Sequence, residues 1–198
     1  MRIIETKVYT FDELSDDVKQ KVINKFREDK EVFLDFFDDN CVYYAKEKGF
    51  EDIELQYRLS YSQGDGLSFS AQKYTMLKEL YLKELGKGKE KTAQLLADNS
   101  TFVCTGNTGR YCFASSSDID LYIENYTSSI NTDCKNINEV VSNVLKELEQ
   151  KYIDVCSELE KRGYDEIEYQ QSDECIIEDI QFPVQSNEYE FTKDGKLI

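Results

Sequence analysis

The chain has 198 residues and carries 40 acidic side chains against 24 lysines and arginines, a formal net charge of −16 at neutral pH. Such a field repels nucleic acid and attracts basic protein surfaces. The sequence contains no histidine, which excludes nucleophilic catalysis of the Ser-His or Cys-His kind. The composition therefore favours a binding protein over an enzyme.

Hydrophobic residues make up 40% of the chain and aromatic residues 13%, so the chain can bury a core and global disorder is disfavoured. The N-terminal residues lack the apolar stretch of a signal peptide. No segment approaches the roughly 20 apolar residues of a membrane span. We therefore expect a cytoplasmic protein.

The cysteine pattern favours free thiols. An even count permits disulfides, but disulfides are rare in the cytoplasm, and no two cysteines have the CxxC spacing. Zinc is disfavoured by the lack of histidine and of paired cysteines. The six cysteines are Cys41, Cys104, Cys112, Cys134, Cys156 and Cys175.

The N-terminal quarter predicts one strand and two helices. Loose alternation over residues 2–11 indicates a strand. Apolar residues at helical spacing predict a helix over 15–28, with Ser15 as its N-cap. A second helix is expected over 31–48, ended by Gly49.

The next segments predict a hairpin and then helical structure. Residues 53–61 alternate strictly between apolar and polar, and 67–70 alternate again after a glycine-containing loop. Residues 72–98 have a helical pattern, which Gly86 to Lys89 divides into two helices.

A second hairpin is expected between residues 101–105 and 110–114, around a glycine-containing turn. Alternation of Ile119, Leu121 and Ile123 with acidic residues predicts a further strand. The polar segment 127–136 is expected to be a loop.

The C-terminal third predicts the longest helix. Apolar residues follow the 3.6-residue period over 138–161, and Gly163 is expected to end that helix. A short helix follows, with Ser172 as its cap and Pro183 at its close. Residues 188–198 are expected to form a final short strand.

These elements predict a single α+β domain over residues 1–198. An antiparallel sheet of about five or six strands would pack against three or four helices, the longest of them near 138–161.

Three segments resemble, in order, a family of phage and prophage proteins often labelled "antitoxin of toxin–antitoxin stability system". They are residues 9–29 (YTFDELSDDVKQKVINKFRED), 59–70 (LSYSQGDGLSFS) and 169–197 (YQQSDECIIEDIQFPVQSNEYEFTKDGKL). None is a catalytic signature. The resemblance implies a mobile-element origin and a small protein directed at a bacterial host. Some acidic phage proteins of this general type inhibit defence nucleases, including anti-CRISPR proteins.

Nucleic-acid mimicry is the leading hypothesis. Residues 147–190 hold 14 carboxylates against three basic side chains. A helix rises about 1.5 Å per residue, so carboxylates four residues apart lie about 6 Å apart, comparable with phosphates along a strand. The candidate partner-binding acids are Glu147, Asp154, Glu158, Asp165, Glu166 and Glu168. The candidate aromatic anchors are Tyr152, Tyr164, Tyr169 and Tyr189.

We therefore expect a non-enzymatic, phage-derived inhibitor in the cytoplasm of a bacterial host cell. It would bind the basic nucleic-acid-binding surface of a host defence protein, such as a CRISPR effector nuclease. We expect no cofactor, no direct contact with nucleic acid and no membrane contact.

Two alternatives remain. One is an antitoxin-like protein that neutralises a toxin. The other is a small divalent-metal-dependent enzyme that uses Asp118, Asp120 and Glu124, which would share one face of a strand. An ordinary solvated face opposite Ile119 and Leu121 also explains those acids.

Overall fold

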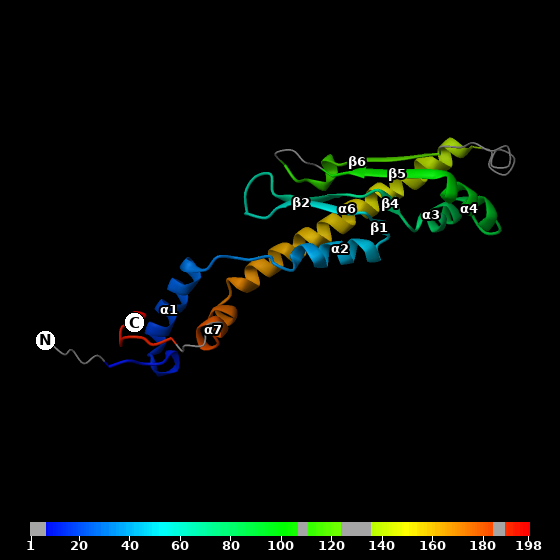
Figure 1. Cartoon of the computed structure of the whole chain (residues 1–198). Coiled ribbons are helices and arrows are strands. Elements are labelled where there is room, and N and C mark those ends of the chain that lie inside the picture. The colour runs from blue at the N-terminus through cyan, green and yellow to red at the C-terminus, as the bar shows by residue number, and fades with distance from the viewer. Residues whose placement is uncertain (1–6, 107–110, 124–135, 184–188) are drawn as a thin grey trace. The chain divides into compact units, whose positions relative to one another are not determined.

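A computed structural model describes residues 7–106, 111–123, 136–183 and 189–198 of the chain (Figure 1). The chain divides into two compact units. Unit 1 is Met1–Leu34 with Tyr164–Ile198, and unit 2 is Asp35–Gly163. The expected single domain stays a prediction, because two compact units in one chain can fold together or separately.

The predicted α+β class is confirmed by the described residues. Their α-helices are α1 (Asp16–Asp29), α2 (Phe37–Glu47), α3 (Leu77–Leu85), α4 (Glu90–Asn99), α6 (Ile137–Gln170) and α7 (Asp173–Gln181), and the 3-10 turns are η1 (Phe11–Glu13) and η2 (Ala114–Ser116). Their strands are β1 (Phe50–Glu51), β2 (Glu54–Arg58), β3 (Gly66–Ser70), β4 (Lys73–Tyr74), β5 (Ser100–Thr105) and β6 (Asp118–Ile123).

The strands are antiparallel, as expected, and pair two by two as β1–β4, β2–β3 and β5–β6. The β2–β3 hairpin is the one that strict alternation predicts, with Leu55 opposite Phe69. Ala71 and Cys104 exchange backbone hydrogen bonds of 2.9 Å, which connects the end of β3 to β5. The strands of unit 2 therefore form a divided sheet.

The prediction of a hairpin between 101–105 and 110–114 is wrong. Strand β5 pairs with β6 instead, with Phe102 opposite Leu121. Both side chains are buried, so the pairing places the apolar faces of the two strands on the same core. The described residues of the expected partner contact the first hairpin, where the Cys112 amide donates to the Gly64 carbonyl at 3.3 Å. Residues 107–110 lie outside the described part.

The prediction that Gly163 ends the longest helix is also wrong, because α6 continues to Gln170. Gly163 is buried, and a Cβ there would lie 2.3 Å from Leu59 and 2.9 Å from Phe37. Glycine therefore serves close packing here and does not mark a helix end. Figure 1 shows α6 crossing the strands of unit 2, and the fully buried Tyr152 belongs to this stretch.

Other helix boundaries follow local signals with one exception. The helix expected over 31–48 begins only at Phe37, where Asp38 and Asp39 occupy the favourable first turn. The division of 72–98 into two helices is confirmed, and Gly86 and Gly88 between them have φ angles of +86° and +85°.

In unit 1, α1 and α7 lie side by side (Figure 1). They enclose a core of Phe11, Leu14, Val22, Ile23, Ile176, Ile180 and Phe191. Ser172 caps α7 as predicted, since its Oγ accepts from the Cys175 amide at 3.2 Å. Ser15 occupies the cap position of α1 without a side-chain hydrogen bond.

The strands expected at the two ends of the chain reduce to isolated bridges in the described residues. Phe191 bridges to Tyr9 and to Leu197. Residues 1–6 and 184–188 lie outside the described part. None of the helices that the structure describes combines the length and the apolar character that crossing a bilayer requires.

Candidate partner-binding surface

The last turns of α6 and the whole of α7 carry the densest acidic run of the chain. From residue 163 to residue 192 there are nine carboxylates and no lysine or arginine. Seven of them lie on these two helices of unit 1 and are exposed, and we call them the acidic surface: Asp165, Glu166, Glu168, Asp173, Glu174, Glu178 and Asp179. Asp173 and Glu174 also occupy the first turn of α7, where the helix dipole favours negative charge.

Two cations of the α1 region neutralise only part of this surface. Arg27 forms an ion pair with Asp173, and its Nε donates to the Gln171 carbonyl at 2.8 Å. Lys30 Nζ lies 2.6 Å from Asp179 Oδ2 and 3.2 Å from Cys175 Sγ. No ion pair to the other five carboxylates occurs among the residues that the structure describes. The surface therefore keeps a net negative charge.

Lys30 has a raised pKa. Partial burial is the largest single influence and lowers it, but the hydrogen bonds to Asp179 and Cys175 and the charges of these partners outweigh burial. Lys30 is therefore fixed as a cation, and only 18% of its side chain is exposed. It anchors α7 to the segment after α1 and offers little positive charge to a partner.

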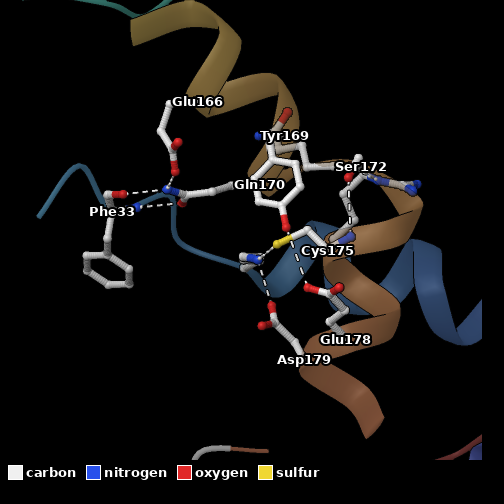
Figure 2. Close-up of polar contacts among 11 residues, drawn as sticks. Phe33, Glu166, Tyr169, Gln170, Ser172, Cys175, Glu178 and Asp179 are labelled. Atoms are coloured by element: carbon white, nitrogen blue, oxygen red, sulfur yellow. Dashed lines mark hydrogen bonds and ion pairs between the residues drawn. The ribbon is translucent and has the colours of Figure 1, made fainter. Parts of the chain in front are cut away.

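The end of α6 is anchored by Gln170 (Figure 2). Its side chain accepts from the Phe33 amide at 3.0 Å and donates to the Phe33 carbonyl at 2.6 Å. It also donates to Glu166 Oε1 at 2.8 Å. These bonds hold Glu166 and the following turn of α6 in a fixed orientation.

Tyr169 lies within the acidic surface. Its ring is 47% exposed, and Figure 2 shows its hydroxyl directed at Glu178, with 3.5 Å between the oxygens. The charge of the Glu178 carboxylate raises the pKa of the Tyr169 hydroxyl. Tyr169 therefore combines an exposed apolar ring with surrounding carboxylates, as an interface anchor requires.

The candidate acids in unit 2 are more strongly neutralised. Glu147 lies 2.7 Å from Lys83 Nζ and 3.9 Å from Lys151 Nζ. Glu158 pairs with Arg162 at 2.9 Å. Asp154 is exposed and accepts from the Gln150 side chain at 2.8 Å. Only Asp154 of these three is without an ion pair in the described part of the molecule, so the acidic surface of unit 1 is the stronger candidate.

The assignment of Tyr152 as a partner-binding anchor is wrong, because this side chain is fully buried. Tyr164 and Tyr189 are half-buried, and the Tyr189 ring packs against Phe26 with 5.2 Å between ring centroids. Helical spacing could not separate the buried Tyr152 and the half-buried Tyr164 from the exposed Tyr169 on α6, since inward and outward positions alternate within one turn.

Sequence reasoning left the α7 acids out of the candidate set. The signal for them was the unbroken absence of basic residues from 163 to 192.

For the metal alternative, Asp118 and Asp120 are exposed on β6, and Glu124 lies outside the described residues. The described parts of the chain bring together no group of three metal-ligating side chains. Five of the six cysteines are described, and all five are free thiols, as expected.

No protein-family model matches the chain, and neither a curated protein nor a solved structure matches it.

Proposed function

We propose that this chain is a non-enzymatic, phage-derived inhibitor that binds the basic nucleic-acid-binding surface of a host defence protein, such as a CRISPR effector nuclease. One observation carries the proposal: seven exposed carboxylates on adjoining helical segments pair with only two cations among the described residues of unit 1. The proposed origin and host rest on the resemblance of the three segments to phage proteins.

Helical spacing supports competition with a nucleic-acid strand. Glu174 and Glu178 are four residues apart on α7, which places their Cα atoms about 6 Å apart along the helix. Asp165 and Glu168 are three residues apart within one turn of α6, which places their Cα atoms about 4.5 Å apart along the helix. A groove that binds phosphates offers lysine and arginine at similar intervals, so the acidic surface can occupy it and displace the strand.

Long-range attraction is the expected energetic contribution of this surface. Exposed charges act mainly on the association rate, and salt screens them over about 10 Å at 0.1 M. Tyr169 supplies apolar contact area in the middle of these charges. The proposed complex therefore forms fast and weakens steeply as salt is added.

A displacement assay tests the proposal. Purified protein is titrated into CRISPR effector nucleases carrying fluorescent guide or target strands, and fluorescence anisotropy reports release of the strand. The test variant combines Asp165→Lys, Glu168→Lys and Glu178→Lys, three exposed positions. We expect it to need about tenfold or more protein for half-release, because each reversal replaces attraction with repulsion.

A matched control makes the same charge change elsewhere in unit 1. Glu28→Lys, Asp29→Lys and Glu31→Lys are exposed positions at and just after the end of α1. Lysine near a helix C-terminus is compatible with the dipole, so both variants should fold. Equal potency of the test variant and the control would refute the acidic surface as the partner-binding site. Failure of the wild-type protein to release any strand would refute the proposed function. Binding to a basic toxin without strand release would support the antitoxin alternative instead.

A further inference from the structure

The loop of the β2–β3 hairpin in unit 2 holds a tyrosine in an unusual backbone conformation. Tyr61 has a φ angle of +54°, in the left-handed region that bulky side chains seldom adopt. Its side chain is 64% exposed. An exposed aromatic residue with this backbone conformation is not explained by core packing.

A buried carboxylate fixes the loop around Tyr61. Asp65 is 9% exposed and accepts from the amides of Ser60 and Ser62 at 2.6 and 3.0 Å. It also accepts from both serine hydroxyls, at 3.0 and 2.8 Å. Because these four bonds are made by the residues on either side of Tyr61, the loop is organised before any partner arrives.

Two further aromatic side chains lie against the same loop. The Tyr111 ring packs on Gly64, where a Cβ would come within 2.3 Å of it. Tyr111 and Phe113 stack with 5.7 Å between centroids and an interplanar angle of 5°, and they are 40% and 41% exposed. Together, Tyr61, Tyr111 and Phe113 form what we call the aromatic loop surface.

The charge near the hairpin loop is negative. Glu160 of α6 is half-buried, and its pKa is raised first by burial and second by the nearby Asp65 carboxylate. Arg58, at the end of β2, is the only basic residue of the hairpin, against Glu54 and Asp65. A cation is therefore favoured at the aromatic rings, and a phosphate is not.

We propose that the aromatic loop surface binds arginine side chains of a protein partner. A guanidinium group is planar, stacks on aromatic faces and keeps its charge, which suits exposed tyrosine and phenylalanine rings at a loop that holds the Asp65 carboxylate. Nucleobases also stack on such rings, but a chain of net charge −16 repels their phosphates. The inference rests on the proposed function only in taking the partner to be basic.

The test uses the full-length protein and two fluorescent peptides, one of repeated Gly-Arg-Gly units and one of repeated Gly-Lys-Gly units. Anisotropy is measured at about 0.15 M salt, where long-range attraction is reduced. We expect the arginine peptide to bind more tightly than the lysine peptide. Tyr61→Asn, which accepts a positive φ, should weaken arginine-peptide binding about three- to tenfold.

Three controls separate the aromatic contact from folding and from net charge. Tyr61→Phe keeps the ring and should bind as the wild type does. Tyr43→Gln removes an exposed tyrosine of α2 in the same unit and should leave the affinity unchanged. In the wild-type protein, the peptide should shift the ring resonances of Tyr61, Tyr111 and Phe113 in NMR spectra, whether or not the asparagine variant folds.

The outcomes distinguish this inference from the proposed function. Equal affinities for the two peptides, unchanged ring resonances, or binding of a single-stranded oligothymidine at these rings would each overturn the arginine assignment. The lysine reversals on the acidic surface leave the aromatic loop surface intact. Loss of strand release in those variants, with Tyr61→Asn as potent as wild type, would therefore retain the proposed function and reject only this inference.

Discussion

Single hydroxyl and carboxyl groups organise unit 2. The Tyr152 hydroxyl accepts from the Phe69 amide and donates to the Phe69 carbonyl, both at 2.9 Å, and lies 2.8 Å from Ser117 Oγ. It therefore satisfies the buried Phe69 amide and supplies the shorter of two hydrogen bonds to the Phe69 carbonyl, which also accepts from Cys104 Sγ at 3.5 Å. The Asp65 carboxylate likewise accepts from two backbone amides of the hairpin loop, those of Ser60 and Ser62.

The Tyr152 bonds predict a large effect for a small change. Tyr152→Phe should lower the free energy of unfolding by about 1–3 kcal/mol, since the buried Phe69 amide loses its partner and the Phe69 carbonyl keeps only the weaker Cys104 thiol donor. Urea denaturation, followed by circular dichroism, measures the free energy of unfolding. Tyr43→Phe, at a position 67% exposed, is the matched control and should change stability by less than about 0.5 kcal/mol. Equal stabilities of the two variants would contradict this account of Tyr152.

At the scale of elements, α6 combines two roles along one helix. Its earlier turns bury Val144, Leu148 and Tyr152 in unit 2, and its last turns carry Asp165, Glu166 and Glu168 in unit 1. The helix continues through Gly163 because its backbone hydrogen bonds do not require a side chain there. The missing Cβ leaves room for Phe37 and Leu59.

Gly163→Ala tests this packing. Alanine is favoured over glycine in a helix by about 1 kcal/mol. The added Cβ, however, would approach the Phe37 ring to 2.9 Å, and overpacking costs about 1–3 kcal/mol. We expect a net loss of about 1 kcal/mol in urea denaturation, whereas Ser157→Ala, at an exposed position of α6, should be neutral or stabilising. A stabilised Gly163→Ala variant would mean that the neighbouring side chains yield freely.

At the scale of the whole molecule, buried thiol and tyrosine hydroxyl groups stay protonated in the folded chain. The free energy of unfolding therefore depends on pH in the alkaline range. Burial raises the pKa of the Cys41 and Cys104 thiols to about 12, from an ordinary value of 9.0. Burial, with the Asp38 hydrogen bond, raises the pKa of Tyr57 from 10.0 to about 12. The unfolded chain therefore loses these protons before the folded chain does.

The sign of the pH dependence follows. The contribution of the two protonated thiols to the free energy of unfolding is fully present below pH 9. It is lost progressively as pH rises toward about 12. The urea midpoint, measured under reducing conditions, should therefore fall between pH 8 and pH 10.5. Replacing both thiols with alanine should flatten this fall, which separates thiol ionisation from growing charge repulsion. An unchanged slope in the double variant would contradict a contribution from these two thiols.

Local patterns were sufficient for elements whose determinants are close in sequence. The hairpin around Asp65, the helix that Ser172 caps and the break at Gly86 each depend on periodicity, capping or a glycine turn within a few residues. The acidic candidates Asp165, Glu166 and Glu168 were found in the same way, because a run of like charge is visible directly in the sequence.

Tertiary contacts decided the rest. The partner of β5, the passage of α6 through Gly163, the burial of Tyr152 and the place of Tyr111 beside Gly64 all involve residues distant in sequence, 83 positions apart for Tyr152 and Phe69. A one-dimensional pattern shows that a side chain is apolar or a turn is favoured. Which surfaces fill the same space depends on the competition among all apolar faces for one core, and only the folded chain resolves that competition.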